Sequence, residues 1–203
     1  DGKTVIDPRC AVGVMEQFDR DYPDFNVTAT FYVLSNIFGQ DEYIQDKLTY
    51  LVENGYDIGN HTANHANLSE LDDQEALKEL TGHISLIREY LPEYEQSSIA
   101  LPYGAEPKNP AIFTGGSYDG IEVRFMASLL VGANPAPAPC DYSFDPLRLP
   151  RVQALDPSLD TGDSGIYAWI QYFMENPERR YCSDGNPDVV TVPKHMIDRV
   201  DHS

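Results

Sequence analysis

The chain has 203 residues, of which 41% are hydrophobic and 23% are charged. This length and usage are typical of one folded domain and exclude a long disordered chain. Only 14 Lys and Arg oppose 33 Asp and Glu, and the formal charge of -19 makes nucleic acid and anionic membrane surfaces poor partners. No stretch approaches the roughly 20 apolar residues of a membrane helix. We therefore expect residues 1–203 to form a single domain without a membrane span.

The N-terminal third alternates helix and strand patterns. Apolar residues at helical spacing predict a helix over residues 11–22, which Pro23 ends. The run of β-branched and aromatic residues at 27–34 is typical of a strand buried on both faces. A second helix is predicted over residues 44–52, and a short strand over 56–60. This alternation is the beginning of an α/β pattern.

A third helix has the strongest signal. Asp72 is placed as its N-cap, and an apolar stripe continues to Leu91, where Pro92 follows. A strand at 98–101 comes next. Alternating strands and helices imply parallel strands whose functional loops gather at the carboxyl ends. The segments directly after strands 56–60 and 98–101 are therefore the predicted location of a site.

The C-terminal half is less regular. A strand is predicted at 128–132, and the proline-dense stretch 134–139 is expected to be an ordered surface loop. Residues 167–175 have a helical pattern. A final strand is predicted at 188–192, ended by a proline.

Two histidines follow the strand at 56–60. His61 and His65 are four residues apart, and a tight turn would bring both imidazoles onto one face. Neutral imidazoles are good ligands for Zn²⁺ and similar divalent metals. The alternative is a pair of ordinary loop histidines bonded to backbone carbonyls. A zincin protease would need a glutamate beside the first histidine, and Thr62 occupies that position.

Three segments, in order, resemble motifs of the polysaccharide deacetylase family (the NodB-homology domain, carbohydrate esterase family four). Residues 56–68, YDIGNHTANHANL, resemble the second motif, H-[ST]-x-x-H preceded by G-x-x-[IV]-G-N. Residues 28–33, TATFYV, resemble the A-T-F-F-V strand, and residues 101–104, LPYG, the end of the third motif, R-x-P-Y-G. The second half is similar only to a divergent branch, through residues 129–135 and 145–151.

The resemblance implies a fold and a function. The fold would be a distorted (β/α) barrel with seven or fewer strands. The chain would be a hydrolase that deacetylates an N-acetylated (or O-acetylated) cell-wall or extracellular polysaccharide, and it would be secreted and act outside the cell or in the cell envelope. A divalent metal, zinc in many members, would be held by His61 and His65, and the backbone N–H of Tyr103 would stabilise the oxyanion.

Other family groups are displaced or missing. A catalytic zinc usually has three protein ligands, and the third would come from the aspartates of the first motif, T-F-D-D-G. Asp1-Gly2 resembles the end of that motif, but no strand precedes it. We expect both aspartates upstream of Asp1, so that the domain lacks its first strand. If the first motif does lie within residues 1–203, Asp1 is the leading carboxylate.

Two further departures from the family motifs concern the residue that would hold the general base and the residue that would act as the general acid. The arginine of the third motif falls at Ala100, although Arg148 or Arg151 could reach the site from a later loop. The acid histidine of the fifth motif has only His195 near its place, two positions late, and we interpret it as an exposed residue. His83 and His202 are expected at the surface. These departures leave a second hypothesis, a glycan-binding relative that has lost catalysis.

Overall fold

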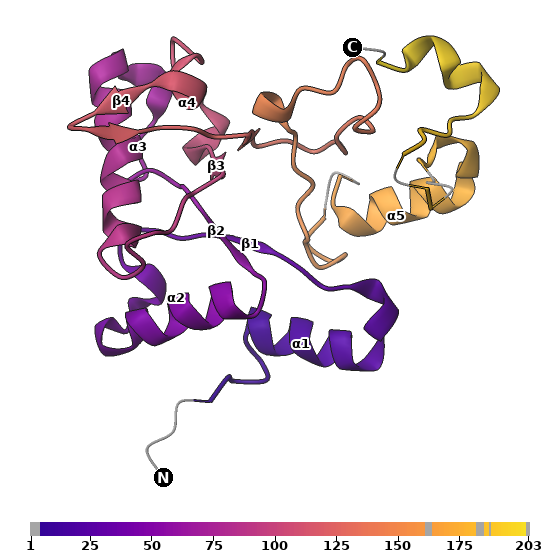
Figure 1. The fold of residues 1–203 in the computed structure, drawn as a ribbon. Coiled ribbons are helices and arrows are strands. Elements are labelled where there is room, and N and C mark those ends of the chain that lie inside the picture. The colour runs from indigo at the N-terminus through magenta and orange to yellow at the C-terminus, as the bar shows by residue number, and fades with distance from the viewer. Residues whose placement is uncertain (1–4, 161–163, 182–184, 187, 202–203) are drawn as a thin grey trace.

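The computed structural model describes residues 5–160, 164–181, 185–186 and 188–201. Figure 1 shows two parts. Helices and short strands of the first 130 residues form one part, and loops and helix α5 of the later residues form the other. The site predicted after strands 56–60 and 98–101 lies in the first part.

The strands form a parallel arrangement. β1 (Thr30–Tyr32) pairs with β2 (Asp57–Gly59), and β3 (Ser98–Ala100) pairs with β6 (Ala127–Leu129). A parallel bridge from Asn60 to Ile99 joins the two pairs, and another from Leu129 to Leu149 extends the second pair. The carboxyl ends of β2 and β3 therefore lie side by side. An antiparallel hairpin of β4 (Ser117–Tyr118) and β5 (Ile121–Glu122) stands apart from this sheet.

The helices begin and end where local signals place them. Helix α1 (Ala11–Asp21) ends before Pro23, and α2 (Ile44–Glu53) is followed by Gly55 at a φ of +78°. Helix α3 (Asp73–Arg88) has a complete capping box between Asp72 and Glu75. The other two α-helices are the short α4 (Ile112–Gly115) and, in the C-terminal part, α5 (Ile166–Glu175). Turns of 3₁₀ helix lie at Pro23–Phe25, Ile37–Gly39, Asp41–Tyr43, Leu68–Glu70, Pro102–Gly104, Pro146–Arg148, Pro177–Arg179 and Lys194–Arg199.

Two apolar cores hold the first part together. The first core joins α2, β2 and the end of α3, and the second lies between α3, β3 and the segment around α4 and β5. The fully buried residues of these cores include Leu48, Ile58, Ile87, Leu80, Ile99 and Leu101. Helix α3 contributes to both cores, since Ile87 lies in one and Leu80 in the other. It is therefore the element that joins them.

The predicted helices are confirmed, and the predicted strands are confirmed in part. The strand expected at 27–34 has only three paired residues, all half-buried. The strand expected at 188–192 is wrong, because these residues do not adopt strand structure, and Val189 and Val190 remain 49% and 52% exposed. A single strand without a neighbour has no ladder to complete. The proline-dense stretch 134–139 is a loop, as predicted.

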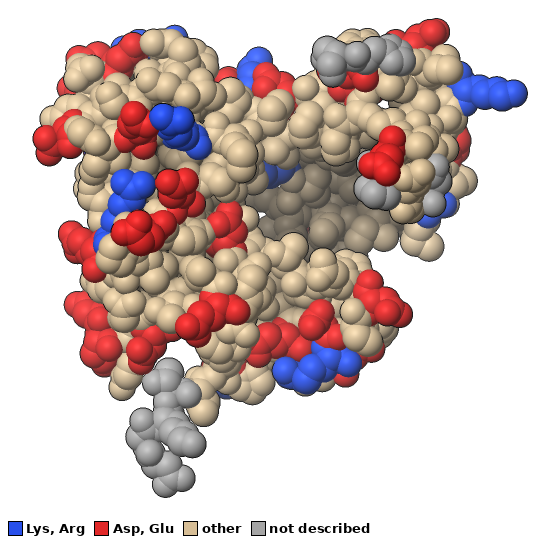
Figure 2. Space-filling view, viewed as in Figure 1, with Lys and Arg blue, Asp and Glu red and all other residues tan. Residues whose placement is uncertain are grey.

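The fold class is confirmed as parallel α/β, but the barrel is not closed. The parallel strands that the structure describes form an open sheet that begins at β1 and ends at the bridge to Leu149. Within the described residues, no helix is both long and apolar enough to cross a membrane. Figure 2 shows acidic side chains over much of the visible face, with a hollow between the two parts that is lined mainly by uncharged residues.

Candidate active site

His61 and His65 lie next to each other at the carboxyl end of β2. Their ring centroids are 4.9 Å apart and their planes meet at 79°. Two imidazoles on one tetrahedral zinc, each bound at about 2.0–2.1 Å, have centroids about 5 Å apart. The observed spacing is therefore compatible with a shared metal, and the metal assignment itself stays a prediction.

The tautomer of His61 follows from its hydrogen bond. Its Nδ1 lies 2.6 Å from the carbonyl oxygen of Ala100, so Nδ1 carries the proton and donates it. Nε2 is then left with its lone pair. Metal-bound histidines usually donate their second N–H in this way. Burial lowers the pKa of His61, which favours the neutral imidazole that a metal requires.

Tyr103 comes from the loop after β3 and completes a cluster of three rings. Its centroid is 4.9 Å from that of His65, and its side chain is 69% exposed. The Tyr103 N–H donates to no backbone carbonyl among the described residues, whereas the next N–H, that of Gly104, donates to Leu101. A free backbone donor in a loop whose tyrosine ring contacts His65 is a suitable partner for a negatively charged oxygen.

The backbone is strained at this cluster. Thr62, His65 and Tyr103 have φ values of 60°, 55° and 59°. A β-branched residue such as Thr62 rarely adopts this region, and each such residue costs on the order of 1–3 kcal/mol. Strain of this kind persists only where the surrounding contacts determine the conformation.

Asn60 supplies the contacts that hold Thr62. The Asn60 side chain is fully buried, and its Oδ1 accepts a bond of 2.9 Å from the Thr62 N–H. Its Nδ2 donates to the carbonyl of Leu80 on α3 and to Oε1 of Gln96, both at 3.0 Å. The Thr62 hydroxyl in turn accepts from the Ala66 N–H. The loop is thereby fixed from inside the protein.

Helix α3 also holds the loop from outside. The Ala63 N–H donates to the Glu79 carbonyl, and the Asn64 N–H and Nδ2 donate to the two carboxylate oxygens of Glu79 at 2.9 and 2.8 Å. The residues between the two histidines therefore have few free backbone groups. This pinning keeps His61 and His65 in place before any ligand binds.

His83 is buried, and its expected surface position is wrong. It has no exposed area, and its Nε2 lies 2.8 Å from the Val33 carbonyl. Its Nδ1 lies 3.1 Å from Nε2 of Gln96, whose Oε1 accepts from Asn60. One arrangement satisfies all of these contacts: neutral His83 donates through Nε2 and accepts through Nδ1. Burial lowers the pKa of His83, in agreement with a neutral ring.

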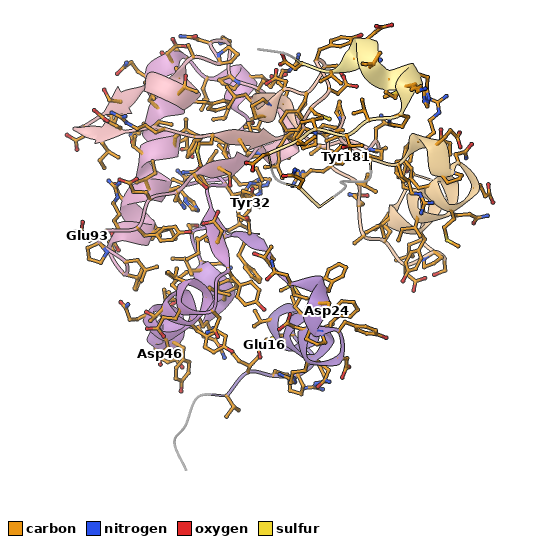
Figure 3. All side chains as sticks on the ribbon, turned by 45° about the vertical axis from the view of Figure 1, so that its right-hand side comes forward. Glu16, Asp24, Tyr32, Asp46, Glu93 and Tyr181 are labelled. Atoms are coloured by element: carbon orange, nitrogen blue, oxygen red, sulfur yellow. The ribbon has the colours of Figure 1, made fainter. Side chains whose placement is uncertain are left out.

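The face of the sheet that carries His61 also carries Tyr32, which the sequence did not single out. In parallel strands paired residues point the same way, so Tyr32 shares the face of Gly59, its partner in β2. The Tyr32 hydroxyl is 2.9 Å from Oγ of Ser98, and Figure 3 shows Tyr32 near the middle of the molecule. A Cβ on Gly59 would lie 2.2 Å from the Tyr32 ring, so only glycine leaves room for it. Strand alternation could have placed Tyr32 on this face.

The two arginines that could replace the one missing at Ala100 differ in their partners. Arg148 is ion-paired with Glu106 at 3.0 Å and is exposed. Arg151 is half-buried, and its Nε donates to the Leu130 carbonyl at 2.5 Å. Its positive charge acts on both Tyr32 and His61. Of the two, Arg151 is the one whose charge acts on residues of this face of the sheet.

The described residues supply two of the three expected metal ligands. No group of three His, Cys, Asp or Glu side chains in the described part of the chain is arranged to hold a metal. Asp1, the candidate within the chain, and His202 lie outside the described residues. His195 is exposed in the Lys194–Arg199 turn, as expected. The pair is thus compatible with a metal through its imidazoles, and no third ligand joins it among the described residues.

The described residues form a parallel α/β sheet with a histidine pair at the carboxyl end of one of its strands. In a comparison with models of known protein families, residues 23–113 match the family described as "Polysaccharide deacetylase". These residues contain β1, both histidines and Tyr103. The resemblance to the polysaccharide deacetylase family that the motifs indicated is thereby confirmed over residues 23–113.

Parts of the chain also match solved structures, among them a peptidoglycan deacetylase, PdaC from Bacillus subtilis. It is 24% identical, with a TM-score of 0.37, over 51% of this chain and 48% of that one. A family 4 carbohydrate esterase from Bacillus anthracis is 18% identical, with a TM-score of 0.43, over 84% and 73% of the two chains. The matched part spans about half the length of the first structure. No curated protein sequence matches the chain.

Proposed function

We propose that the protein is a metal-dependent deacetylase of an N-acetylated (or O-acetylated) polysaccharide that acts outside the cell or in the cell envelope. The observation that supports this best is the position of His61, with Nδ1 bonded to Ala100 and Nε2 free, beside His65 and the unpaired N–H of Tyr103. The family of residues 23–113 points to the same chemistry. The strong negative charge suits a neutral glycan better than an anionic polymer.

The proposal assigns a role to each residue of the cluster. His61 and His65 hold the metal, and Ala100 orients His61 through its carbonyl. A metal held by these residues, zinc in the first instance, would supply a Lewis acid for the acetyl carbonyl and would lower the pKa of a bound water. The Tyr103 N–H donates a hydrogen bond to the oxygen that becomes negatively charged. Because Thr62, His65 and Tyr103 are already in strained conformations, little reorganisation is needed when substrate binds.

The third ligand and the general base are proposed to come from a strand beside β1. Among the described residues β1 is paired on one edge only, with β2. A parallel strand on its other edge would end near the carboxyl end of β2 and could place a carboxylate beside the histidines. We propose that such a strand, with its carboxylates, lies upstream of Asp1 in the complete domain.

Zinc binding and acetate release test the proposal. The protein should bind zinc, and His61→Ala or His65→Ala should weaken binding at least tenfold while changing the free energy of unfolding of the metal-free protein by only about 1 kcal/mol. His195→Ala is the matched control, because His195 is exposed and belongs to another part of the chain. Zinc affinity that is unchanged in both site variants would refute the metal site.

A protein extended upstream of Asp1 would distinguish the proposed enzyme from the second hypothesis, a glycan-binding relative. It should bind zinc more tightly and release acetate from an acetylated chito-oligosaccharide, since a carboxylate ligand and base are restored. Equal affinity of the two versions, lost in Asp1→Asn, would assign the carboxylate to Asp1 instead. Oligosaccharide binding without acetate release from either version would favour the second hypothesis, a glycan-binding relative that has lost catalysis.

A further inference from the structure

The second part of the fold contains a cavity that the proposed function does not use. It has a volume of about 730 Å³, within the range of small-molecule sites. It lies between α5, the loop at residues 134–138, the turn at 178–181 and the segment at 192–200 (Figure 1). Its lining contains three basic and two acidic side chains, those of Arg179, Arg180, Arg199, Asp141 and Glu178. In a chain with 14 Lys and Arg against 33 Asp and Glu, this local balance is an exception.

One wall of the cavity is a cluster of aromatic rings on α5. Trp169, Tyr172 and Phe173 lie three and four residues apart and therefore share one face of the helix. Their ring centroids are 5.4, 5.4 and 6.0 Å apart. Nε1 of Trp169 donates to the Ala133 carbonyl at 2.6 Å, which fixes the indole. Every residue of α5 is at least partly exposed, and Tyr172 is 39% exposed, so the rings are accessible to a ligand.

Polar groups form another part of the lining. Arg199 donates from Nε and Nη2 to the two carboxylate oxygens of Asp141, at 2.7 and 3.0 Å, so this pair is neutral as a whole. Arg179 and Arg180 are exposed, and their side chains have no hydrogen bond or ion pair within the part of the chain that the structure describes. Their N–H donors are therefore available. The cavity thus combines apolar ring faces with hydrogen-bond donors at its rim.

These walls suit a ligand that has an apolar face and polar edges. A pyranose ring presents C–H groups on its face, and the negative face of an aromatic ring attracts them. The hydroxyl and acetyl oxygens at the edge of the sugar can accept hydrogen bonds from arginine. A hydrocarbon chain would desolvate the polar groups of the lining without offering them a partner. An anionic polymer is opposed by the formal charge of -19. A neutral sugar unit therefore matches the cavity best.

The cavity is connected to the candidate active site through the segment after β6. Gly104, the residue after Tyr103, packs closely on Val131, since a Cβ on Gly104 would lie 2.7 Å from the Val131 nitrogen. Val131 lies two residues before Ala133, whose carbonyl holds Trp169. Two residues of chain span at most about 7 Å. A polysaccharide chain of several units is therefore long enough to contact both Tyr103 and Trp169.

We propose that the cavity beside Trp169 and Tyr172 is a second sugar-binding site, which holds one unit of a neutral N-acetylated polysaccharide while another unit of the same chain lies at the histidine pair. The identity of the glycan relies on the proposed function. The sugar stacks on the two rings, and Arg179 and Arg180 donate to its hydroxyl and acetyl oxygens. Because contact at one site raises the effective concentration of the chain at the other, long oligosaccharides bind more tightly than short ones.

Tryptophan fluorescence tests this inference, because Trp169 is the single tryptophan of the chain. Metal-free protein is titrated with an N-acetylated chito-oligosaccharide, and the emission of Trp169 should change in a saturable way. Tyr172→Ala should weaken binding about tenfold, since a stacked ring and its contact area are lost. Tyr172→Phe keeps the ring and should bind like the wild type. Arg180→Gln tests the rim independently and should weaken binding about threefold, through loss of a hydrogen bond.

Tyr167→Ala is the matched control. Tyr167 belongs to the same helix and is 57% exposed, but it does not line the cavity. Its oligosaccharide affinity should equal that of the wild type, and circular dichroism should show each variant folded. A wild type without a saturable change, or equal affinities of Tyr172→Ala, Arg180→Gln and the wild type, would overturn the inference. A saturable change with decanoate and none with the oligosaccharide would assign an apolar ligand to the cavity and overturn it as well.

The same variants separate the second sugar site from the proposed function. A wild type that binds the oligosaccharide through Tyr172 but neither binds zinc nor releases acetate would refute the proposed function and leave the second site standing. Acetate release with equal oligosaccharide affinities of Tyr172→Ala and the wild type would do the reverse.

Discussion

Replacing Asn60 with alanine should have two effects. It should destabilise the protein, and it should loosen the histidine loop, residues 61–65. The Asn60 side chain has no exposed area and makes three hydrogen bonds, of 2.9, 3.0 and 3.0 Å. Each contributes about 1 kcal/mol net, and a buried partner left unsatisfied costs about 1–3 kcal/mol. The Leu80 carbonyl can keep a partner within its helix, whereas the Thr62 N–H and Oε1 of Gln96 lose theirs. We therefore expect the free energy of unfolding to fall by about 3 kcal/mol.

The functional consequence follows from the strain at Thr62. Its φ of 60° is supported by the bond to Asn60, so alanine removes the contact that offsets the strain. Relaxation of Thr62 moves His61 and His65 relative to each other, and zinc affinity should fall although neither histidine is changed. Urea unfolding followed by circular dichroism measures the first effect, and zinc titration at low urea the second.

Asn64→Ala is the control for this prediction. Asn64 is an exposed asparagine in the same loop, and its side chain makes one bond, from Nδ2 to Glu79. Its loss should cost less than about 1 kcal/mol. The reasoning would be refuted if Asn60→Ala unfolded within 1 kcal/mol of the wild type, or if it were destabilised no more than Asn64→Ala.

Two further predictions concern buried groups near the site. Gly59→Ala should lower the free energy of unfolding by about 1–3 kcal/mol, because the new Cβ would lie 2.2 Å from the Tyr32 ring. In the control Gly115→Ala, the new Cβ has no neighbour within 4 Å, so this variant should be neutral or stabilising. Urea unfolding measures both effects. His83 has its pKa lowered by burial, so below about pH 6.5 the unfolded chain binds a proton that the folded protein does not. Its contribution to stability should be complete above that pH and fall as the pH drops toward the folded pKa; His83→Gln should flatten this part of the stability profile, and an unchanged profile would contradict the assignment.

The helices were predictable because their signals are local. The capping box of α3 and the proline after α1 act within a few residues of the helix ends they determine. The sequence predicted where most strands lie but not how long they are. The length of a strand depends on the neighbouring strand with which it pairs. The pattern at 188–192 is as β-prone as that at 56–60, yet only the latter contains a strand paired in a sheet.

The site was predictable in its first two residues and not beyond them. The position of His61 and His65 after a strand, with the family motif, was enough to bring them together. The strained φ values of Thr62, His65 and Tyr103 could not be predicted, because no glycine marks these positions. The error at His83 was avoidable, since it lies three residues after Leu80 and four before Ile87, on the stripe of α3 that faces the core.

Helix α3 explains why a strained loop can be rigid without a metal. Its Glu79 holds the loop from outside, the Leu80 carbonyl accepts from Asn60, and His83 connects to Asn60 through Gln96. These three residues lie within two turns of one helix, and the same helix joins both apolar cores. The conformation of the histidine loop is thus coupled to the packing of the whole first part of the fold. A core substitution in α3 that leaves the protein folded, such as Leu80→Val, is expected to reduce zinc affinity as well as stability, because it shifts the carbonyl on which Asn60 depends.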